Sequence, residues 1–213
     1  SKLVPLKGRY RYFHPSKGLV WHEVNSLPVV ELEGTVICHG IVTDITERLE
    51  EEQKLLKVNR LYSFISQINQ VIVRATNEEK LFKEACTIAL EVGKFKMAWI
   101  GLIDSKTDKV VPVMISGTDK GYFSDIKMIS INKDVPQGRG PVGVAIRGGQ
   151  KVVCNDIEND PIMVTWKEEA LSRGYQSLIA LPLKKLGKVI GVFSFYANEK
   201  NFFDAEEVEL LVF

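Results

Sequence analysis

Residues 177–197 read SLIALPLKKLGKVIGVFSFYA, and this stretch decides the fold of the second half of the chain. Its two apolar runs, 177–183 and 188–197, have the length and the β-branched and aromatic content of strands. The Lys-Lys-Leu-Gly segment between them is typical of a β-hairpin turn. Further strands are predicted at 95–103, 110–116, 127–132 and 151–155. Helices are predicted after Thr76, at 140–149, at 160–174 and after Asp204. Helices and strands mixed in this way indicate an α+β fold.

The composition is that of an ordinary globular protein. The chain has 213 residues, of which 45% are hydrophobic and 26% charged, a length that suits one or two domains. Its 28 Lys and Arg residues nearly balance 27 Asp and Glu residues, leaving a net charge of +1. No nucleic-acid partner is expected, because such proteins carry a basic excess. No apolar run approaches the ~18 residues of a membrane span, so we expect a cytoplasmic protein.

The first third of the chain changes character near residue 46. Residues 7–45 read as antiparallel strands, the second of them interrupted at Pro28. Residues 46–75 contain no Gly or Pro, which predicts one long helix or two in series. Its apolar residues recur at alternating spacings of three and four, a pattern typical of a coiled-coil seam: Val58, Leu61, Ile65, Ile68 and Ile72. This stripe either packs on its own domain or forms the seam of a parallel homodimer, and we favour the homodimer.

Two stretches resemble known families. Residues 9–48 (RYRYFHPSKGLVWHEVNSLPVVELEGTVICHGIVTDITER) resemble the C-terminal part of a PAS domain, the PAC segment. The resemblance implies a partial antiparallel PAS sheet over residues 1–46, followed by a signalling-helix linker over residues 47–60. The opening strands that wall a PAS ligand pocket are absent, so this segment is not expected to bind a cofactor by itself.

Residues 61–213 resemble a GAF domain of multi-sensor histidine kinases and diguanylate cyclases, with the C-terminal helix cut off at the end of the chain. The matching blocks are MAWIGL (97–102), GRGPVG (138–143), VCNDI (153–157) and ALSRGYQSLIALPL (170–183). The resemblance implies an antiparallel sheet of about six strands with helices on both faces. Terminal helices would cover one face, and a small-molecule pocket would lie on the other.

The implied pocket has eight candidate ligand-binding residues. Polar contacts would come from Arg139, Gly140 and Asp156, and the remaining positions are aromatic walls and one thiol: Trp99, Tyr122, Trp166, Tyr175 and Cys154. Each has a simpler interpretation. Arg139 pairs locally, Asp156 caps the turn that follows it, and the aromatic residues fill the core.

No cofactor is expected. Residues 138–143 spell G-x-G-x-x-G, but Pro141 and the short helix do not fit a dinucleotide site. All three histidines, His14, His22 and His39, lie before the GAF-like part, which argues against haem held by a GAF histidine. Bilin is not expected, because Thr165-Trp166 stands where cyanobacterial relatives carry Cys-His. Three widely spaced cysteines make a metal site unlikely on sequence grounds.

The sequence therefore predicts a regulatory fragment that acts as a homodimer within a multi-domain signalling protein. We favour a sensor histidine kinase as the parent protein. No catalytic motif stands out, so we expect no enzymatic activity in this chain. Two alternatives stay open: a structural dimerisation spacer with no ligand, and a GAF-type redox enzyme similar to free methionine sulfoxide reductases. The redox enzyme would need several pocket cysteines, where this chain offers Cys154.

Overall fold

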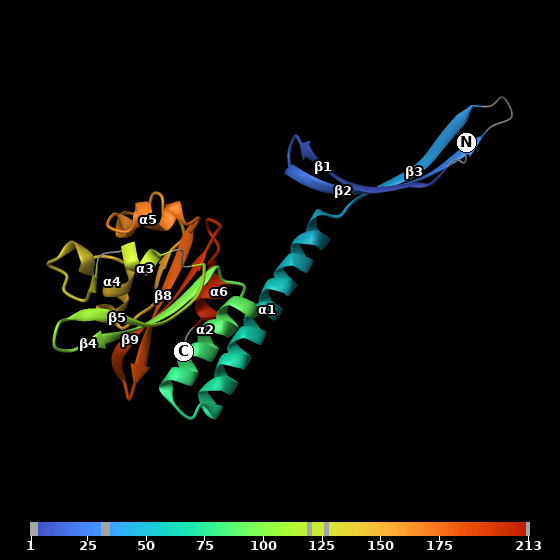
Figure 1. Ribbon diagram of the computed structural model, residues 1–213. Helices are drawn as coiled ribbons and strands as arrows, with labels where there is room; N and C mark the ends of the chain where they lie inside the picture. Colours follow the sequence, from blue (N-terminus) through green and yellow to red (C-terminus); the bar gives the residue numbers. More distant parts are fainter. Residues whose placement is uncertain (1–3, 31–34, 119–120, 126–127, 212–213) are drawn as a thin grey trace. The chain divides into compact units, whose positions relative to one another are not determined.

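The computed structural model describes residues 4–30, 35–118, 121–125 and 128–211 (Figure 1). It divides the chain into two compact units, Ser1–Val58 and Asn59–Phe213. Helix α1 (Thr46–Arg74) is continuous and contributes residues to both units. Among the described parts of its helices, none is long and apolar enough to cross a membrane.

The first unit contains a three-stranded antiparallel sheet in the order β1-β2-β3. Its strands are β1 (Leu6–His14), β2 (Gly18–Val30) and β3 (Val36–Asp44). The predicted interruption at Pro28 is wrong, because β2 runs through it and pairs Pro28 with Cys38. Pairing with β1 ends at Ser26. Pro28 therefore lies where β2 has one paired neighbour, and a residue without an N–H is tolerated on such an edge.

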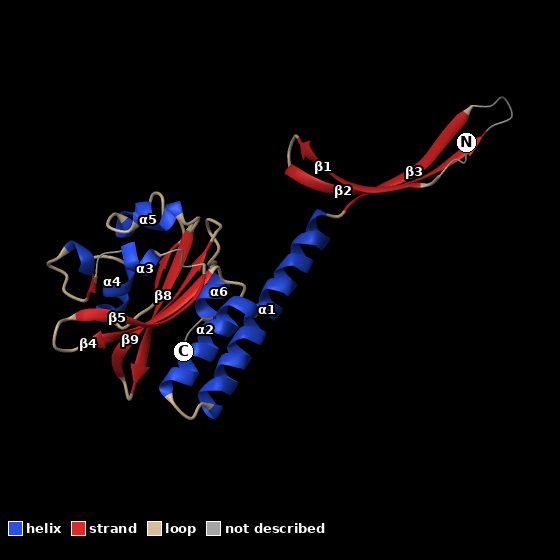
Figure 2. Ribbon diagram, in the orientation of Figure 1, coloured by secondary structure: helices blue, strands red, loops and turns tan. Residues whose placement is uncertain are grey.

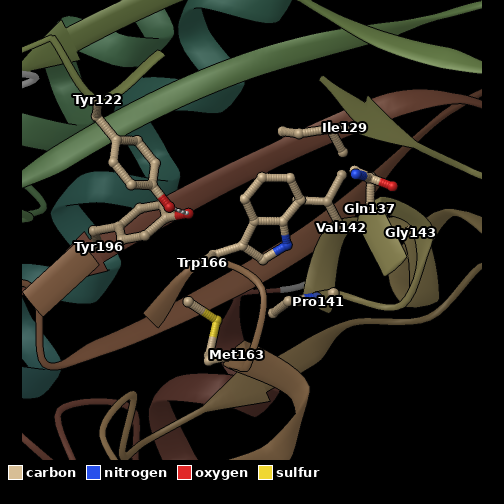
Figure 3. A pocket seen from close by; sticks show the side chains of 10 residues that line it. Tyr122, Ile129, Gln137, Pro141, Val142, Gly143, Met163, Trp166 and Tyr196 are labelled. Carbon is tan, nitrogen blue, oxygen red and sulfur yellow. Dashed lines mark hydrogen bonds between the residues drawn. The ribbon is translucent and has the colours of Figure 1, made fainter. Parts of the chain in front are cut away.

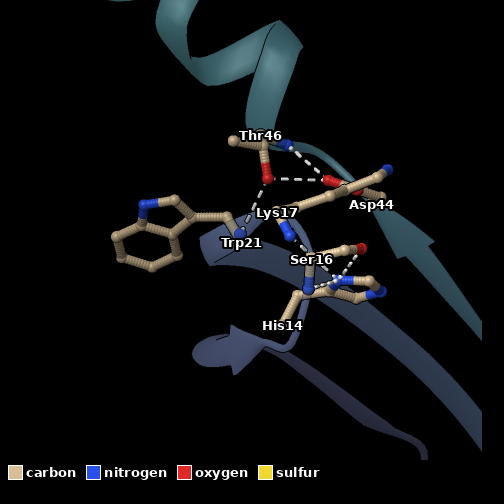
Figure 4. A network of polar contacts seen from close by, with 6 residues as sticks. All are labelled: His14, Ser16, Lys17, Trp21, Asp44 and Thr46. Carbon is tan, nitrogen blue, oxygen red and sulfur yellow. Dashed lines mark hydrogen bonds and ion pairs between the residues drawn. The ribbon is translucent and has the colours of Figure 1, made fainter.

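A polar network joins this sheet to the start of α1 (Figure 4). Asp44 Oδ1 accepts hydrogen bonds from the backbone N (3.0 Å) and the hydroxyl (2.7 Å) of Thr46. The Thr46 hydroxyl oxygen accepts in turn from the backbone N of Trp21 at 2.8 Å. These bonds lower the pKa of Asp44 to about 2, with the Thr46 hydroxyl as the largest cause. Asp44 is therefore ionised at neutral pH and caps the start of the helix.

The second unit is built on a six-stranded antiparallel sheet in the order β6-β5-β4-β9-β8-β7. The predicted hairpin is confirmed: β8 and β9 pair from Ser177 with Ala197 to Lys185 with Lys188. Its two turn residues, Leu186 and Gly187, both have positive φ, the backbone of a tight type I′ turn. The strands are β4 (Met97–Asp104), β5 (Lys109–Gly117), β6 (Ile129–Ser130), β7 (Val152–Cys154), β8 (Ser177–Lys185) and β9 (Lys188–Ala197).

Helices cover both faces of this sheet (Figure 2). On one face, the 59–74 part of α1 packs beside α2 (Glu78–Glu91) and α6 (Ala205–Leu210) over a core that contains Phe95 and Phe195. On the other face lie α3 (Tyr122–Asp125), α4 (Pro141–Gly148) and α5 (Lys167–Ser172), over a core that contains Trp99 and Tyr196. The predicted α+β architecture, with helices on both faces of a six-stranded sheet, is confirmed.

The helix starts follow the capping signals closely. Asp204 caps α6, where its Oδ1 accepts from the backbone N of Glu207 at 2.8 Å. Helix α2 is capped by Asn77, one residue later than predicted, because Asn77 Oδ1 accepts from the backbone N of Lys80. The predicted helix 160–174 is broken into a 3₁₀ turn, η2 (Pro161–Met163), and α5. The break contains Val164 and Thr165, β-branched residues that are poor helix formers, and the buried Trp166 follows them.

The predicted seam of α1 does not form one exposed stripe, because its residues are divided between the core and the helix surface. Leu61 and Ile68, with Phe64 between them, are at most 4% exposed and belong to the core beneath the sheet. They are therefore not available to a second chain, and for them the alternative interpretation holds. Of the other predicted seam residues, Val58 and Ile65 are half-buried and Ile72 is 52% exposed.

Candidate functional site

The sheet face beneath α3, α4 and α5 contains a small cavity of about 20 Å³ (Figure 3). Three of the predicted site residues, Tyr122, Gly140 and Trp166, line it. The sequence did not point to the other lining residues: Ile129, Gln137, Pro141, Val142, Gly143, Met163 and Tyr196. A space of this size holds about one water molecule, whereas pockets for small organic ligands span about 300–1,000 Å³. In this conformation the candidate pocket is closed.

The side chain that closes the pocket is Trp166. It follows η2, points into the cavity (Figure 3), and is 7% exposed. Its backbone N donates to the Met163 carbonyl at 2.8 Å, and its carbonyl accepts from Ala170 N at 3.0 Å. A Cβ on Gly140 would overlap the indole nitrogen. Gly140 therefore has a packing role, because only glycine allows the indole to approach the start of α4 this closely.

Buried tyrosines form one side of the cavity and the layer behind it. Tyr122 and Tyr196 line it with their hydroxyl oxygens 3.4 Å apart. Tyr175 packs against both rings but is not a lining residue, and its hydroxyl donates to the Thr118 carbonyl. Burial raises the pKa of Tyr122 to about 12 and that of Tyr196 well above its ordinary value. Both cavity hydroxyls are therefore protonated at neutral pH and can donate to a bound group.

The two charged residues predicted for the pocket lie outside it. Arg139 is exposed, and its guanidinium donates to the carbonyls of Lys133 (3.0 Å) and Asp134 (3.2 Å). The geometry therefore supports local pairing of Arg139, which stabilises the loop before α4.

Asp156 likewise serves its own loop. Its Oδ1 accepts from the backbone N of Glu158 at 3.1 Å, and its Oδ2 accepts from Asn159 Nδ2 at 2.8 Å. Lys200 Nζ lies 3.0 Å from Oδ1. The bond from Asn159, and then the one from Lys200, lower the pKa of Asp156. The structure therefore supports the simpler of the two roles predicted for Asp156, a cap on the turn that follows it.

Trp99 and Cys154 are buried in the core behind the cavity and do not line it. Burial raises the pKa of the Cys154 thiol to about 12, so the reactive thiolate is scarce at neutral pH. Cys86 belongs to the core on the opposite face of the sheet, and Cys38 lies in the first unit. Among the residues that the structure describes, no group of three or more His, Cys, Asp or Glu side chains could hold a metal ion.

The comparisons with known proteins agree with this architecture. The family model of the GAF domain matches residues 75–212, more than half of the chain. The chain belongs to the GAF domain family. Similar to it is the methyl sulfide methyltransferase-associated sensor of Methanosarcina acetivorans, at 26% identity over 186 residues. That match covers 84% of this chain but 17% of the relative, so the chain spans a small part of that sensor's length.

Two solved structures share the fold. One is the GAF domain of a phosphoenolpyruvate-protein phosphotransferase from Coxiella burnetii, with a TM-score of 0.59 and 17% identity over 72% of this chain and 86% of that chain. The other is free methionine-R-sulfoxide reductase from Neisseria meningitidis, with a TM-score of 0.58 and 22% identity over 71% and 81% of the two chains. At these identities the likeness concerns the GAF fold alone.

The closed cavity makes a testable prediction about Trp166. In the Trp166→Ala variant the space vacated by the indole is enclosed by apolar and aromatic side chains, and we expect a loss of about 3–5 kcal/mol of stability. Added indole should fill this space and raise the melting temperature of the variant, because a ligand that binds only the folded state stabilises it. The measurement is thermal unfolding with and without indole.

Two controls accompany this experiment. Indole should not shift the wild type, whose space is occupied, nor the Trp21→Ala variant, which alters a half-buried tryptophan of the first unit. A melting temperature of Trp166→Ala that is insensitive to indole would show that the loops collapse into the space, and would remove Trp166 as the side chain that holds the pocket closed.

Proposed function

We propose that this chain is a regulatory segment of a larger signal-transduction protein, first of all a sensor histidine kinase, in which the GAF domain relays conformational changes through a helical homodimer. The similar protein from Methanosarcina acetivorans is a sensor, and this chain covers a small part of its length. Both facts are those expected of one module among several.

The observation that carries the proposal is the way α1 is built into the GAF domain. Phe64 is fully buried, and its ring packs edge-on against Phe95 at 5.5 Å and Phe195 at 5.7 Å. Interlocked core side chains transmit displacement, because a close-packed interior has few voids to absorb it. A shift of the sheet therefore moves α1, and a shift of α1 moves the sheet.

A buried ion pair ties α1 to the last helix as well. Arg60 Nη2 lies 2.5 Å from Glu207 Oε1, and Arg60 Nη1 donates to the Gly93 carbonyl at 2.6 Å. The Glu207 side chain is fully buried and that of Arg60 is 17% exposed. One guanidinium thus connects α1, the end of α2 and α6. These are the elements through which a relay would enter and leave the domain.

We further propose that the first unit is the PAC part of a PAS domain that delivers the signal to α1. Support comes from the three antiparallel strands and from the capped junction at Asp44 and Thr46, where the helix leaves the sheet. On this proposal α1 is the signalling helix between two sensory modules, and it belongs structurally to the second of them.

The size of the cavity favours a second candidate, the spacer that binds no ligand. A domain whose pocket holds about one water molecule senses a small molecule only if Trp166 moves out. We also propose that the chain has no catalytic activity of its own, which the raised pKa of Cys154 supports. The redox alternative has less support, since Cys86 lies across the sheet from that thiol.

A fusion protein distinguishes a domain that relays a signal from a structural spacer. Residues 1–213 are joined through α6 to the phosphoacceptor and ATP-binding domains of a histidine kinase, and autophosphorylation is measured with and without indole. For a relay, indole changes the rate several-fold in the Trp166→Ala fusion and leaves the wild-type fusion unchanged. If indole binds the variant fusion and the rates stay equal, the chain is a spacer and the relay proposal fails.

A further inference from the structure

The hairpin of β8 and β9 extends beyond the sheet as a two-stranded ribbon (Figure 1). Pairing of β8 with β7 ends at Ala180, and pairing of β9 with β4 begins at Gly191. Within the described sheet, residues 184–190 therefore pair only with each other. The turn at the end of the ribbon consists of Leu186 and Gly187, and its twist matches that of the strands. The tip of the hairpin is thus a narrow protrusion from the domain.

Leu186, at the end of this ribbon, is in an unfavourable place for a leucine. Its side chain is 98% exposed and contributes nothing to the core. Its φ of 50° lies in the left-handed region, which is costly for a bulky residue and which type I′ turns normally fill with Asn, Asp or Gly. Elsewhere in the described chain, the non-glycine residues with positive φ are polar: Lys94, Asp108 and Asn201. Neither core packing nor turn geometry therefore explains a leucine at this position.

Three lysines lie next to this leucine. Lys184, Lys185 and Lys188 are all exposed, and Lys185 pairs directly with Lys188 across the ribbon. Like charges in direct cross-strand positions destabilise a hairpin. Lys185 Nζ lies 3.0 Å from Glu78 Oε1, but both side chains are 64% exposed, and such surface pairs are weak. Lys184 and Lys188 form no ion pair with any residue that the structure describes. The tip therefore has a local excess of positive charge.

A strained backbone, an exposed apolar side chain and opposed like charges meet at one turn. Local conflicts of this kind are typical of functional sites, where they are retained for a purpose other than folding. The apolar side chain and the cations around it would both be satisfied by an anionic surface with an apolar interior.

The shape of the tip favours a lipid surface over a protein. An ordinary protein interface takes about 20–30 residues from each partner, which a two-residue turn on a narrow ribbon does not supply. A lipid surface needs no complementary shape, because apolar side chains enter the boundary between headgroups and acyl chains while Lys side chains stay among the headgroups. Anionic lipids give the cytoplasmic face of membranes a negative potential that attracts clustered lysines.

We propose that the tip of the β8–β9 hairpin contacts an anionic lipid surface. Leu186 enters the surface at the level of the headgroups, and Lys184, Lys185 and Lys188 lie beside the lipid phosphates. The contact is weak and reversible, because one apolar side chain and a few lysines provide limited affinity. It requires neither a ligand in the GAF cavity nor a homodimer, so it does not depend on the proposed relay.

Co-sedimentation of the full chain with lipid vesicles at low salt tests the charge of this surface. The chain should bind vesicles of phosphatidylcholine and phosphatidylserine at least about tenfold more tightly than vesicles of phosphatidylcholine alone, since each lysine adds about fivefold to the affinity for an anionic surface. Lys184→Gln combined with Lys188→Gln should weaken this binding about 25-fold for the same reason.

Lys96→Gln is the matched control for the lysine variant. Lys96 is exposed, and its backbone N donates to the Tyr196 carbonyl near the end of β9 that is remote from the turn. Its loss should leave vesicle binding unchanged. A wild-type chain that does not bind the phosphatidylserine vesicles would overturn the lipid contact in favour of an acidic protein partner. An equal loss of affinity in Lys96→Gln and in the double variant would overturn the hairpin tip as the site.

Leu186→Asn separates a role in binding from a role in the fold. Asn is favoured at this position of a type I′ turn, so the melting temperature of the variant should equal or exceed that of the wild type. Its affinity for the phosphatidylserine vesicles should fall about tenfold, because the apolar side chain that enters the surface is lost. A lower melting temperature, or unchanged vesicle binding, would contradict the role proposed for Leu186.

Discussion

Replacement of Phe64 by alanine should destabilise the GAF domain by about 3–5 kcal/mol, the usual cost of removing a fully buried aromatic ring. The ring is 0% exposed and contacts Phe95 and Phe195 edge-on, so its loss leaves a cavity between α1 and the sheet. Chemical denaturation followed by tryptophan fluorescence reports the change, because Trp99 lies on β4, one of the two central strands of the same sheet.

The control for this substitution is Gln67→Ala. Gln67 lies on the exposed side of the same helix, and exposed helix positions change stability by about 0.5 kcal/mol or less. Because alanine is the best helix former, propensity cannot explain a loss in either variant, and an equal loss in both would mean that removal of the buried ring is not the cause. An unchanged stability of Phe64→Ala would show that α1 does not belong to the core of the domain.

Replacement of Arg60 by alanine should cost about 3–5 kcal/mol, because breaking a buried ion pair leaves a charge without its partner. Glu207 is fully buried, and the guanidinium also donates to the Gly93 carbonyl and stacks on the Phe202 ring, 4.9 Å from its centroid. Denaturant unfolding at neutral pH measures the change.

A double-mutant cycle shows how much of this loss belongs to the charge. Arg60→Met with Glu207→Leu replaces both partners by apolar side chains of similar length, and should be less destabilised than Arg60→Met alone. Additive losses in the two single variants would contradict a direct coupling between α1 and α6.

The regular elements followed from local patterns. The hairpin of β8 and β9 is encoded by two apolar runs around a short turn that contains Gly187, and the caps at Asp44 and Asp204 are encoded by side chains that bond nearby backbone N–H groups. The two faces of α1 could not be separated in this way. Leu61 and Tyr62 are neighbours in sequence, and only the packed sheet shows which of them points inward.

The candidate site was harder to predict than the fold. Its lining comes from segments far apart in the chain, such as Tyr122, Met163 and Tyr196, and their meeting depends on loop conformations that hydrophobic periodicity does not encode. The charged residues predicted for the pocket lie outside it for a related reason. Arg139 and Asp156 lie in the expected segments, yet their side chains satisfy nearby backbone groups, a role that competes with ligand binding wherever loops need capping.

The central claim is that α1 is an integral part of the GAF domain, so that helix and sheet move together. Native-state hydrogen exchange on the full chain tests it. The amides of residues 61–71 should then open with the same free energy as those of β4 and β9, because all of them depend on one core. Rapid local opening of residues 61–71, with β4 and β9 still protected, would contradict the claim.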